Sequence, residues 1–211
     1  GAGRRCLANH QTRHRTSMDE LKARFPRVSS TQLSLFASEE IPLPNNPYAM
    51  GRLLDEKGKV AEAKRLYQRA IETEDHVPES YCNIGVLESQ MGRSVEAITA
   101  FAHALAIRPL FVEARYNMAL EYLSREEYVL AELHIEVAIQ LDPKTPDHHF
   151  CRALVGIGKD EFNVAMESLG KFRDLAPNER LEEVGELERL VQDRLRSHRS
   201  RHPVSKRDTA G

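Results

Sequence analysis

The chain has 211 residues, of which 41% are hydrophobic and 29% charged, and its formal net charge is −2. This composition is typical of a soluble, helix-rich protein, and no apolar run approaches the ~20 residues of a membrane-spanning helix, so no membrane partner is expected. Cys6, Cys82 and Cys151 are widely spaced, which favours reduced thiols and a cytoplasmic location.

The charge is unevenly distributed along the chain. Residues 1–43 hold seven basic and four acidic residues and 193–211 hold six and two, whereas 44–192 hold 17 and 26. We therefore expect an acidic body between two disordered basic ends, a leader at 1–43 and a tail at 198–211. The Arg-rich, acid-free residues 1–17 are also typical of a leader for an organelle matrix, or lie upstream of a natural start at Met18.

Residues 31–36, TQLSLF, place three large apolar side chains in a polar, proline-bounded stretch. One interpretation is that Leu33, Leu35 and Phe36 pack on the helical body that follows or enter its groove. The other is a short linear motif: QLSLF resembles the pentapeptide by which bacterial replication and repair proteins bind the sliding clamp. The resemblance implies that Gln32 hydrogen-bonds in a small subsite while Leu35 and Phe36 fill a hydrophobic pocket. A chance apolar piece of the leader is the third alternative.

A period of 34 residues governs the middle of the chain. Small residues recur where two helices would cross, a bulky residue fills the adjacent gap, and a proline ends each unit. The series are Gly51, Gly85, Ala119 and Ala153; Ala63, Ala97, Ala131 and Ala165; Tyr67, Phe101, Ile135 and Leu169; Ala70, Ala104 and Ala138; and Pro109, Pro143 and Pro177.

This pattern resembles the tetratricopeptide repeat (TPR), a helix–turn–helix unit of 34 residues. The resemblance covers four units, 44–77, 78–111, 112–145 and 146–179. It implies an all-α fold, a right-handed solenoid of antiparallel helix pairs. The end units depart from the pattern at Pro47, Asp75, Gly156 and Phe172, as the ends of a repeat stack commonly do.

Residues 180–197 carry a stripe of aliphatic side chains opposite a charged face. A helix of this kind after four helix pairs is expected to cap the last repeat. A coiled-coil helix is the alternative, although the stripe is shorter than three to four heptads. The aliphatic residues are Leu181, Val184, Leu187, Leu190, Val191 and Leu195.

No catalytic constellation, phosphate loop or cofactor motif is recognisable, so we expect no enzyme activity and no cofactor. The densest group of metal-ligating residue types is Asp147, His148, His149 and Cys151. Adjacent histidines on a helix point about 100° apart, and Asp147 after Pro146 is typical of a helix start. We therefore predict no metal site.

The TPR resemblance implies that the first helix of each unit lines a groove for an extended peptide. The amides of Asn83 and Asn117, one repeat apart, offer a donor and an acceptor to a peptide main chain; the alternative is that each braces its own helix pair. The grip on a terminal carboxylate seen in some TPR proteins is not expected, because Tyr48, Glu113 and Asn117 replace its basic residues. The predicted groove residues are Tyr48, Arg52, Asn83, Val86, Tyr116, Asn117, Leu120, Phe150 and Leu154.

These observations predict a non-catalytic adaptor or scaffold that binds a protein or peptide segment. The alternative is a nucleic-acid-associated or replication and repair accessory factor tethered to a sliding clamp. The basic C-terminal run RLRSHRSRHPVSKR has no interleaved Phe, Tyr or Trp for base stacking, so nucleic-acid binding is expected to be at most weak and unspecific.

Overall fold

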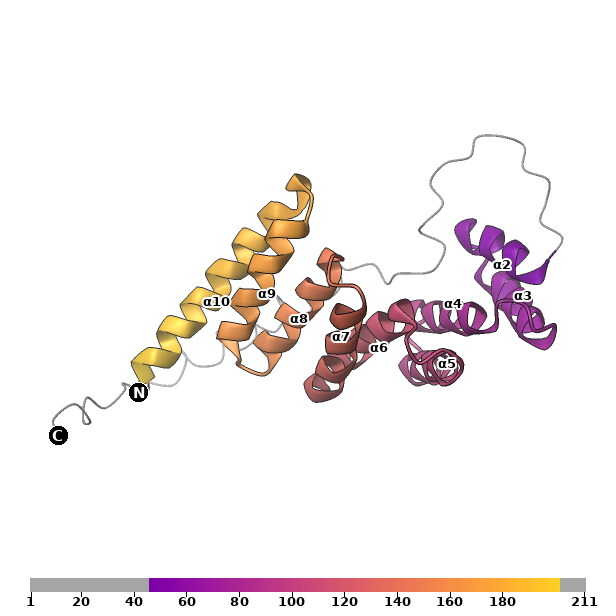
Figure 1. Cartoon of the computed structure of the whole chain (residues 1–211), viewed down its shortest axis with the longest axis horizontal. Coiled ribbons are helices and arrows are strands. Elements are labelled where there is room, and N and C mark those ends of the chain that lie inside the picture. Colours follow the sequence, from indigo (N-terminus) through magenta and orange to yellow (C-terminus); the bar gives the residue numbers. More distant parts are fainter. Residues whose placement is uncertain (1–45, 202–211) are drawn as a thin grey trace, which may run out of the picture.

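The computed structural model describes residues 46–201. This part of the chain forms nine α-helices and one 3-10 turn and contains no strand (Figure 1). The expected leader 1–43 and residues 202–211 of the expected tail lie outside the described residues. The elements are α2 (Pro47–Glu56), α3 (Val60–Glu72), α4 (Val77–Gln90), α5 (Ser94–Ile107), α6 (Val112–Ser124), α7 (Tyr128–Leu141), α8 (Pro146–Gly158), α9 (Phe162–Leu175), η1 (Asn178–Arg180) and α10 (Leu181–Arg201).

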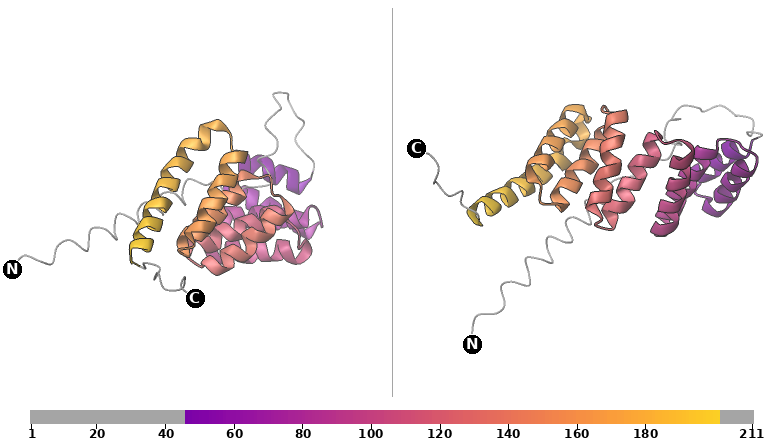
Figure 2. Two further views of the ribbon diagram at one scale, coloured as in Figure 1. Left: turned by 60° about the vertical axis from the view of Figure 1, so that its left-hand side comes forward. Right: turned by 60° about the horizontal axis from the view of Figure 1, so that its bottom comes forward.

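The helices pack as four pairs, α2–α3, α4–α5, α6–α7 and α8–α9, and the short turns make the members of each pair antiparallel. Each second helix also contacts the first helix of the next pair, and α4 contacts α6 as α6 contacts α8. The pairs therefore form an elongated stack with α2 and α3 at one end and α10 at the other (Figures 1 and 2). The expected all-α repeat architecture is confirmed.

The turn between the two helices of a pair explains why the first two pairs have a glycine there. Gly58 and Gly92 have φ angles of 70° and 73°, in the left-handed region that glycine adopts without steric cost. In the next two pairs the same repeat position holds Glu126 and Asp160, with φ angles of 61° and 60°. The residue that follows closes each turn by donating its backbone N–H to a helix carbonyl, as Arg93 does to Glu88 at 2.9 Å.

The small-against-bulky packing that the repeat predicts is present. Ala63, Ala97, Ala131 and Ala165 are all fully buried. A Cβ added to Gly85 would lie 2.5 Å from the ring of Phe101, and one added to Gly51 would lie 2.9 Å from the ring of Tyr67. The two helix axes approach this closely only because these residues have no side chain.

Gly156 departs from the repeat pattern, and close packing of two helices explains its lack of a side chain as well. An added Cβ there would lie 3.1 Å from the backbone nitrogen of Ala165 on the partner helix α9. The carbonyl of Gly156 also accepts the backbone N–H of Glu161 at 2.8 Å. Close backbone approach therefore accounts for a glycine inside α8.

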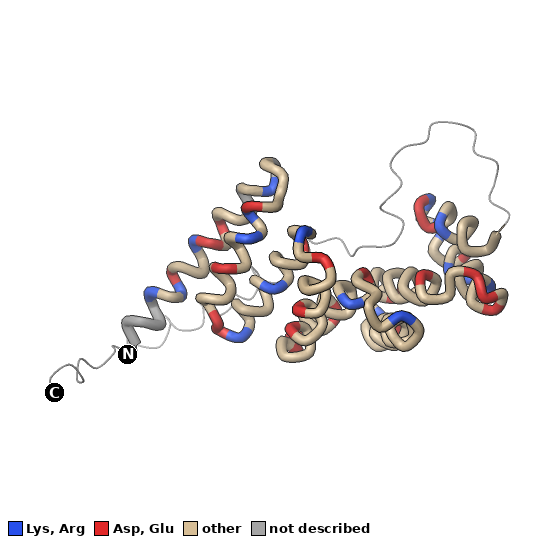
Figure 3. The backbone as a smooth tube through the Cα atoms, viewed as in Figure 1, with Lys and Arg blue, Asp and Glu red and all other residues tan. Residues whose placement is uncertain are grey.

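Helix α10 covers the end of the stack. Val184, Leu187 and Val191 are buried in one hydrophobic cluster with Leu169 and Phe172 of α9. Both acidic and basic residues lie along the helix as far as Arg196 (Figure 3). The helix continues to Arg201, past the expected end at residue 197. None of the described helices has the length and apolar content needed to cross a membrane.

Candidate functional site

The structure places the predicted groove residues on the first helices α2, α4, α6 and α8, as expected, but beneath the surface. Asn83, Asn117 and Phe150 are fully buried, and Tyr116 is 1% exposed. The two asparagine amides therefore do not face solvent in this structure. The others are Tyr48, Val86, Leu120 and Leu154, which are buried, and Arg52, which is partly exposed and lies 3.9 Å from Glu56.

In the last three pairs the first helix is more completely buried than the second. In α4 every residue from Cys82 to Ser89 is buried, and eight consecutive helical residues cover the whole circumference. Helix α4 packs on α3, α5 and α6, whereas the second helices keep side chains such as Val95 and Val129 largely exposed. We call the nine predicted residues the first-helix row.

A contact from the row to Cys82, which lies beside Asn83 on α4, joins neighbouring repeats. The Nδ2 of Asn117 on α6 donates to the Sγ of Cys82 on α4 at 3.8 Å. Burial, partly offset by this hydrogen bond, raises the pKa of the Cys82 thiol to about 12, so the sulfur stays protonated. Tyr116, Leu120, Phe150 and Leu154 share one hydrophobic cluster, while Val86 and Tyr48 belong to two others.

The hydroxyl of Tyr116 is a buried polar group of the row. It has no hydrogen-bond partner among the residues that the structure describes, and burial raises the pKa of Tyr116 well above its usual value. The ring lies 5.2 Å from that of His148 at an angle of 47°. A buried hydroxyl without a partner costs about 1–3 kcal/mol, so a ligand that supplies an acceptor would recover that free energy.

The start of α8 carries Asp147, His148, His149 and Cys151. The first three of these side chains form hydrogen bonds or an ion pair with neighbouring segments. The ring N–H of His148 donates to the carbonyl of Asp142 at 3.0 Å, and that of His149 donates to the carbonyl of Pro143 at 2.8 Å. Asp147 pairs with Arg180 at 2.6 Å. Within residues 46–201 no three metal-ligating side chains converge.

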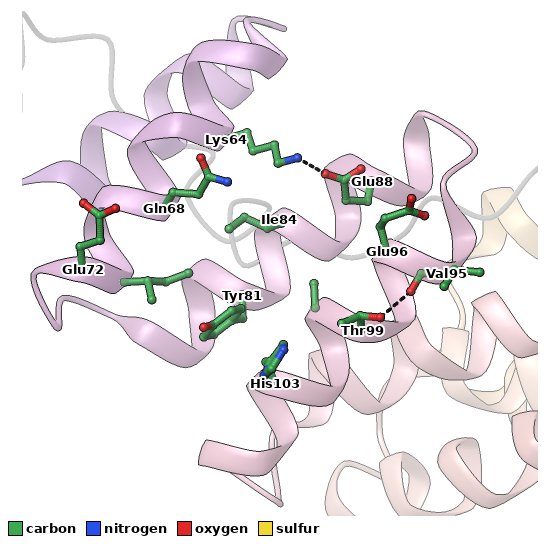
Figure 4. A pocket seen from close by; sticks show the side chains of 12 residues that line it. Lys64, Gln68, Glu72, Tyr81, Ile84, Glu88, Val95, Glu96, Thr99 and His103 are labelled. Atoms are coloured by element: carbon green, nitrogen blue, oxygen red, sulfur yellow. Dashed lines mark hydrogen bonds and ion pairs between the residues drawn. The ribbon is translucent and has the colours of Figure 1, made fainter.

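A second surface feature was not found from the sequence. Helices α3 and α5 form the walls, and α4 the floor, of an open groove of about 750 Å³ (Figure 4). We call it the α3–α5 groove, lined by Lys64, Gln68, Ile71, Glu72, Tyr81, Ile84, Glu88, Val95, Glu96, Thr99, Ala100 and His103. The sequence feature that could have indicated this groove is Val95, a large apolar residue outside the repeat series. In the structure it is 64% exposed.

The candidate linear motif, Gln32, Leu33, Leu35 and Phe36, lies outside the described residues. Nothing in the comparisons with known proteins supports a sliding clamp as a partner.

Comparisons with known proteins agree with the repeat. A family model described as tetratricopeptide repeat matches residues 48–75 and 78–109. The BBSome complex member BBS4 homolog of Drosophila melanogaster is 26% identical over 114 residues, which cover 54% of this chain and 23% of that protein. This chain thus spans less than a quarter of the length of that relative.

Two solved structures show the same fold at low identity. MamA from Desulfovibrio magneticus RS-1, from residue 41 to its end, is 21% identical, with a TM-score of 0.58 over 74% of this chain and 98% of that one. YrrB, whose structure is described as a TPR protein with an unusual peptide-binding site, is 17% identical, with a TM-score of 0.57 over 70% of this chain and 73% of that one.

Proposed function

The chain is a tetratricopeptide repeat protein, and from that premise we propose that it acts as a non-catalytic adaptor or scaffold for protein segments. Repeat proteins of this kind mediate protein–protein interactions, and no catalytic family is identified for the chain. The finer part of the proposal is that the first-helix row holds an extended peptide by its main chain.

The observation that carries this proposal is the buried hydroxyl of Tyr116, which has no hydrogen-bond partner within the described part of the chain. A peptide carbonyl can accept its proton, and the amides of Asn83 and Asn117 can contact further main-chain groups, because an amide both donates and accepts. Main-chain recognition would fix the direction of a peptide without reading its sequence. The peptide-binding site in the description of YrrB also supports a peptide as the ligand class.

Burial of the row sets a condition on binding. Since Tyr116 and Asn117 lie beneath the surface in this state, a peptide reaches them only after the first helices open. The apparent dissociation constant then equals the intrinsic one divided by the fraction of open molecules. We therefore expect slow association and a modest apparent affinity.

The test is the substitution Tyr116→Phe, assayed with a peptide selected from a random library on the wild-type chain. Removing an unpartnered hydroxyl leaves the stability of the free protein unchanged or higher. Affinity for the peptide should fall about 2- to 10-fold, the range for one net hydrogen bond of ~0.5–1.5 kcal/mol. Fluorescence anisotropy measures the affinity and a thermal melt the stability.

Tyr122→Phe is the matched control, because Tyr122 stacks on His134 outside the row, at 5.6 Å. Equal peptide affinity in wild type and Tyr116→Phe would contradict main-chain binding at this hydroxyl. The double variant Asn83→Ala, Asn117→Ala should also weaken binding. Because both amides are fully buried, it should lower stability too, so it is the less specific probe.

A further inference from the structure

The α3–α5 groove offers a surface that the first-helix row does not use. Its walls are single stripes of two second helices: Lys64, Gln68 and Glu72 follow one another at one-turn spacing on α3. Glu96, Ala100 and His103 do the same on α5. Tyr81 on the floor stacks on His103 with ring centroids 5.0 Å apart. The groove shares no residue with the row.

The base of the groove is apolar. Ile84 is 9% exposed and Ala100 is 7% exposed, and Ile71 is half-buried beside them. Val95 stands at the rim with 64% of its surface exposed (Figure 4). A ligand with its own apolar stripe would remove these side chains from water, at about 25 cal/mol per Å² buried.

The charges of the groove fall into two groups. Glu88 is satisfied: burial alone would raise its pKa, but hydrogen bonds and the charges of Lys64 and Arg93 outweigh this and lower it. Glu72 and Glu96 are exposed, one on each wall, and neither forms an ion pair with any residue of the described part of the chain. Two acidic groups are thus available to a basic partner.

Helix stability does not explain both of these acids. Glu96 is in the first turn of α5, where a negative charge is favourable. Glu72 is the last residue of α3, where the helix dipole disfavours it. One repeat further on, the same two positions hold Ala106 and Leu130, so the repeat fold does not require an acid at either.

We propose that the α3–α5 groove binds one amphipathic helix of a partner protein, with its apolar stripe on the groove floor and lysine or arginine residues beside Glu72 and Glu96. A helix fits because three helices line the groove and its i, i+4 stripes match the ridges of another helix. Helical walls also offer no strand edge for an extended peptide. Charge complementarity selects a basic helix over an acidic one.

The probe is a synthetic amphipathic peptide of about 18 residues, since isolated helices shorter than ~12–15 residues are marginal in water. It carries leucines at i, i+3, i+4 and i+7 with lysines flanking that stripe, and a matched peptide carries glutamates instead. Binding to the full chain is measured by fluorescence anisotropy at low and physiological salt. The lysine peptide should bind and the glutamate peptide should not.

Val95→Lys should weaken binding by at least ~10-fold, because it places a charge on the apolar stripe. Val129→Lys is the matched control: it has the same repeat position on α7 and is 71% exposed. It should leave affinity within about 2-fold of wild type. Both sites are exposed, so thermal melts should be unchanged.

Glu72→Gln with Glu96→Gln should weaken binding about 3- to 10-fold at low salt and reduce its salt dependence. Glu126→Gln, at an exposed acid in the turn between α6 and α7, should have no effect. The proposal is overturned by absence of binding, by equal binding of both peptides, or by equal loss in Val95→Lys and Val129→Lys. Tyr116→Phe should leave binding of this probe unchanged, which separates the groove from the row.

Discussion

The turn inside each helix pair places one residue in the left-handed region of backbone conformation. Glycine occupies it at residues 58 and 92, but Glu126 and Asp160 occupy the same repeat position further on. A side chain in this conformation costs roughly 1–2 kcal/mol. The repeat geometry therefore dominates over the local preference of Glu126.

Glu126→Gly should raise the free energy of unfolding by about 0.5–1 kcal/mol, since the relief of strain exceeds the entropy cost of a new glycine. The mirror substitution Gly92→Ala should lower it by about 1 kcal/mol, and no neighbouring atom lies within 4 Å of the added Cβ. Urea denaturation measures both. Destabilisation by Glu126→Gly would show that the side chain contributes more than its backbone costs.

His134 makes stability depend on pH. Burial first, and then the charge of Arg115, lower its pKa to about 4, and Arg115 lies 3.4 Å from its Nδ1. The unfolded chain, with a histidine pKa of about 6.5, binds the proton between these two values while the folded chain does not. Protonation of His134 therefore does not reduce the stability of the folded chain above pH ~6.5. The free energy of unfolding falls as the pH decreases from there towards 4, because only the unfolded chain binds the proton.

The measurement compares urea denaturation at pH 7 and pH 5 for wild type, His134→Gln and His103→Gln. The stability of His134→Gln should decrease less between pH 7 and pH 5 than that of wild type. His103→Gln, at an exposed residue, should show the same decrease as wild type. Identical pH dependence in all three proteins would show that His134 can be protonated in the folded state.

At the scale of elements, the sequence could predict each helix pair because a 34-residue period allows only one register. Ala97 and Phe101 fall four residues apart on one side of α5, and both are fully buried. The end of α10 was harder to predict from the sequence, because charged residues continue through Arg201 without a proline or glycine to stop the helix.

Leu187→Ala in α10 should lower the free energy of unfolding by about 2–5 kcal/mol, because Leu187 is 1% exposed in the cluster with α9. Gln192→Ala, at an exposed position of the same helix, should change it by less than about 0.5 kcal/mol. Chemical denaturation gives both values. A neutral Leu187→Ala would mean that α10 does not cap the stack in solution.

For the whole molecule, the positions of the first-helix row follow from the repeat register, but their burial does not. A register shows which residues share one side of a helix, whereas exposure depends on what packs on that side. The α3–α5 groove was not predicted for a related reason. Lys64, Tyr81 and Glu96 come from three helices and meet only because of the angle at which two pairs stack.

The most direct test of peptide binding is a chemical-shift map of the isotope-labelled full chain titrated with the library-selected peptide. We predict saturable shifts at Asn83, Tyr116, Asn117, Leu120 and Phe150, on α4, α6 and α8, with little change at Val95 or Val129. Because the row is buried in the free protein, exchange should be slow and saturation should require the helices to open. Shifts confined to the second helices, or the absence of saturable shifts, would contradict binding of an extended peptide on the first-helix row.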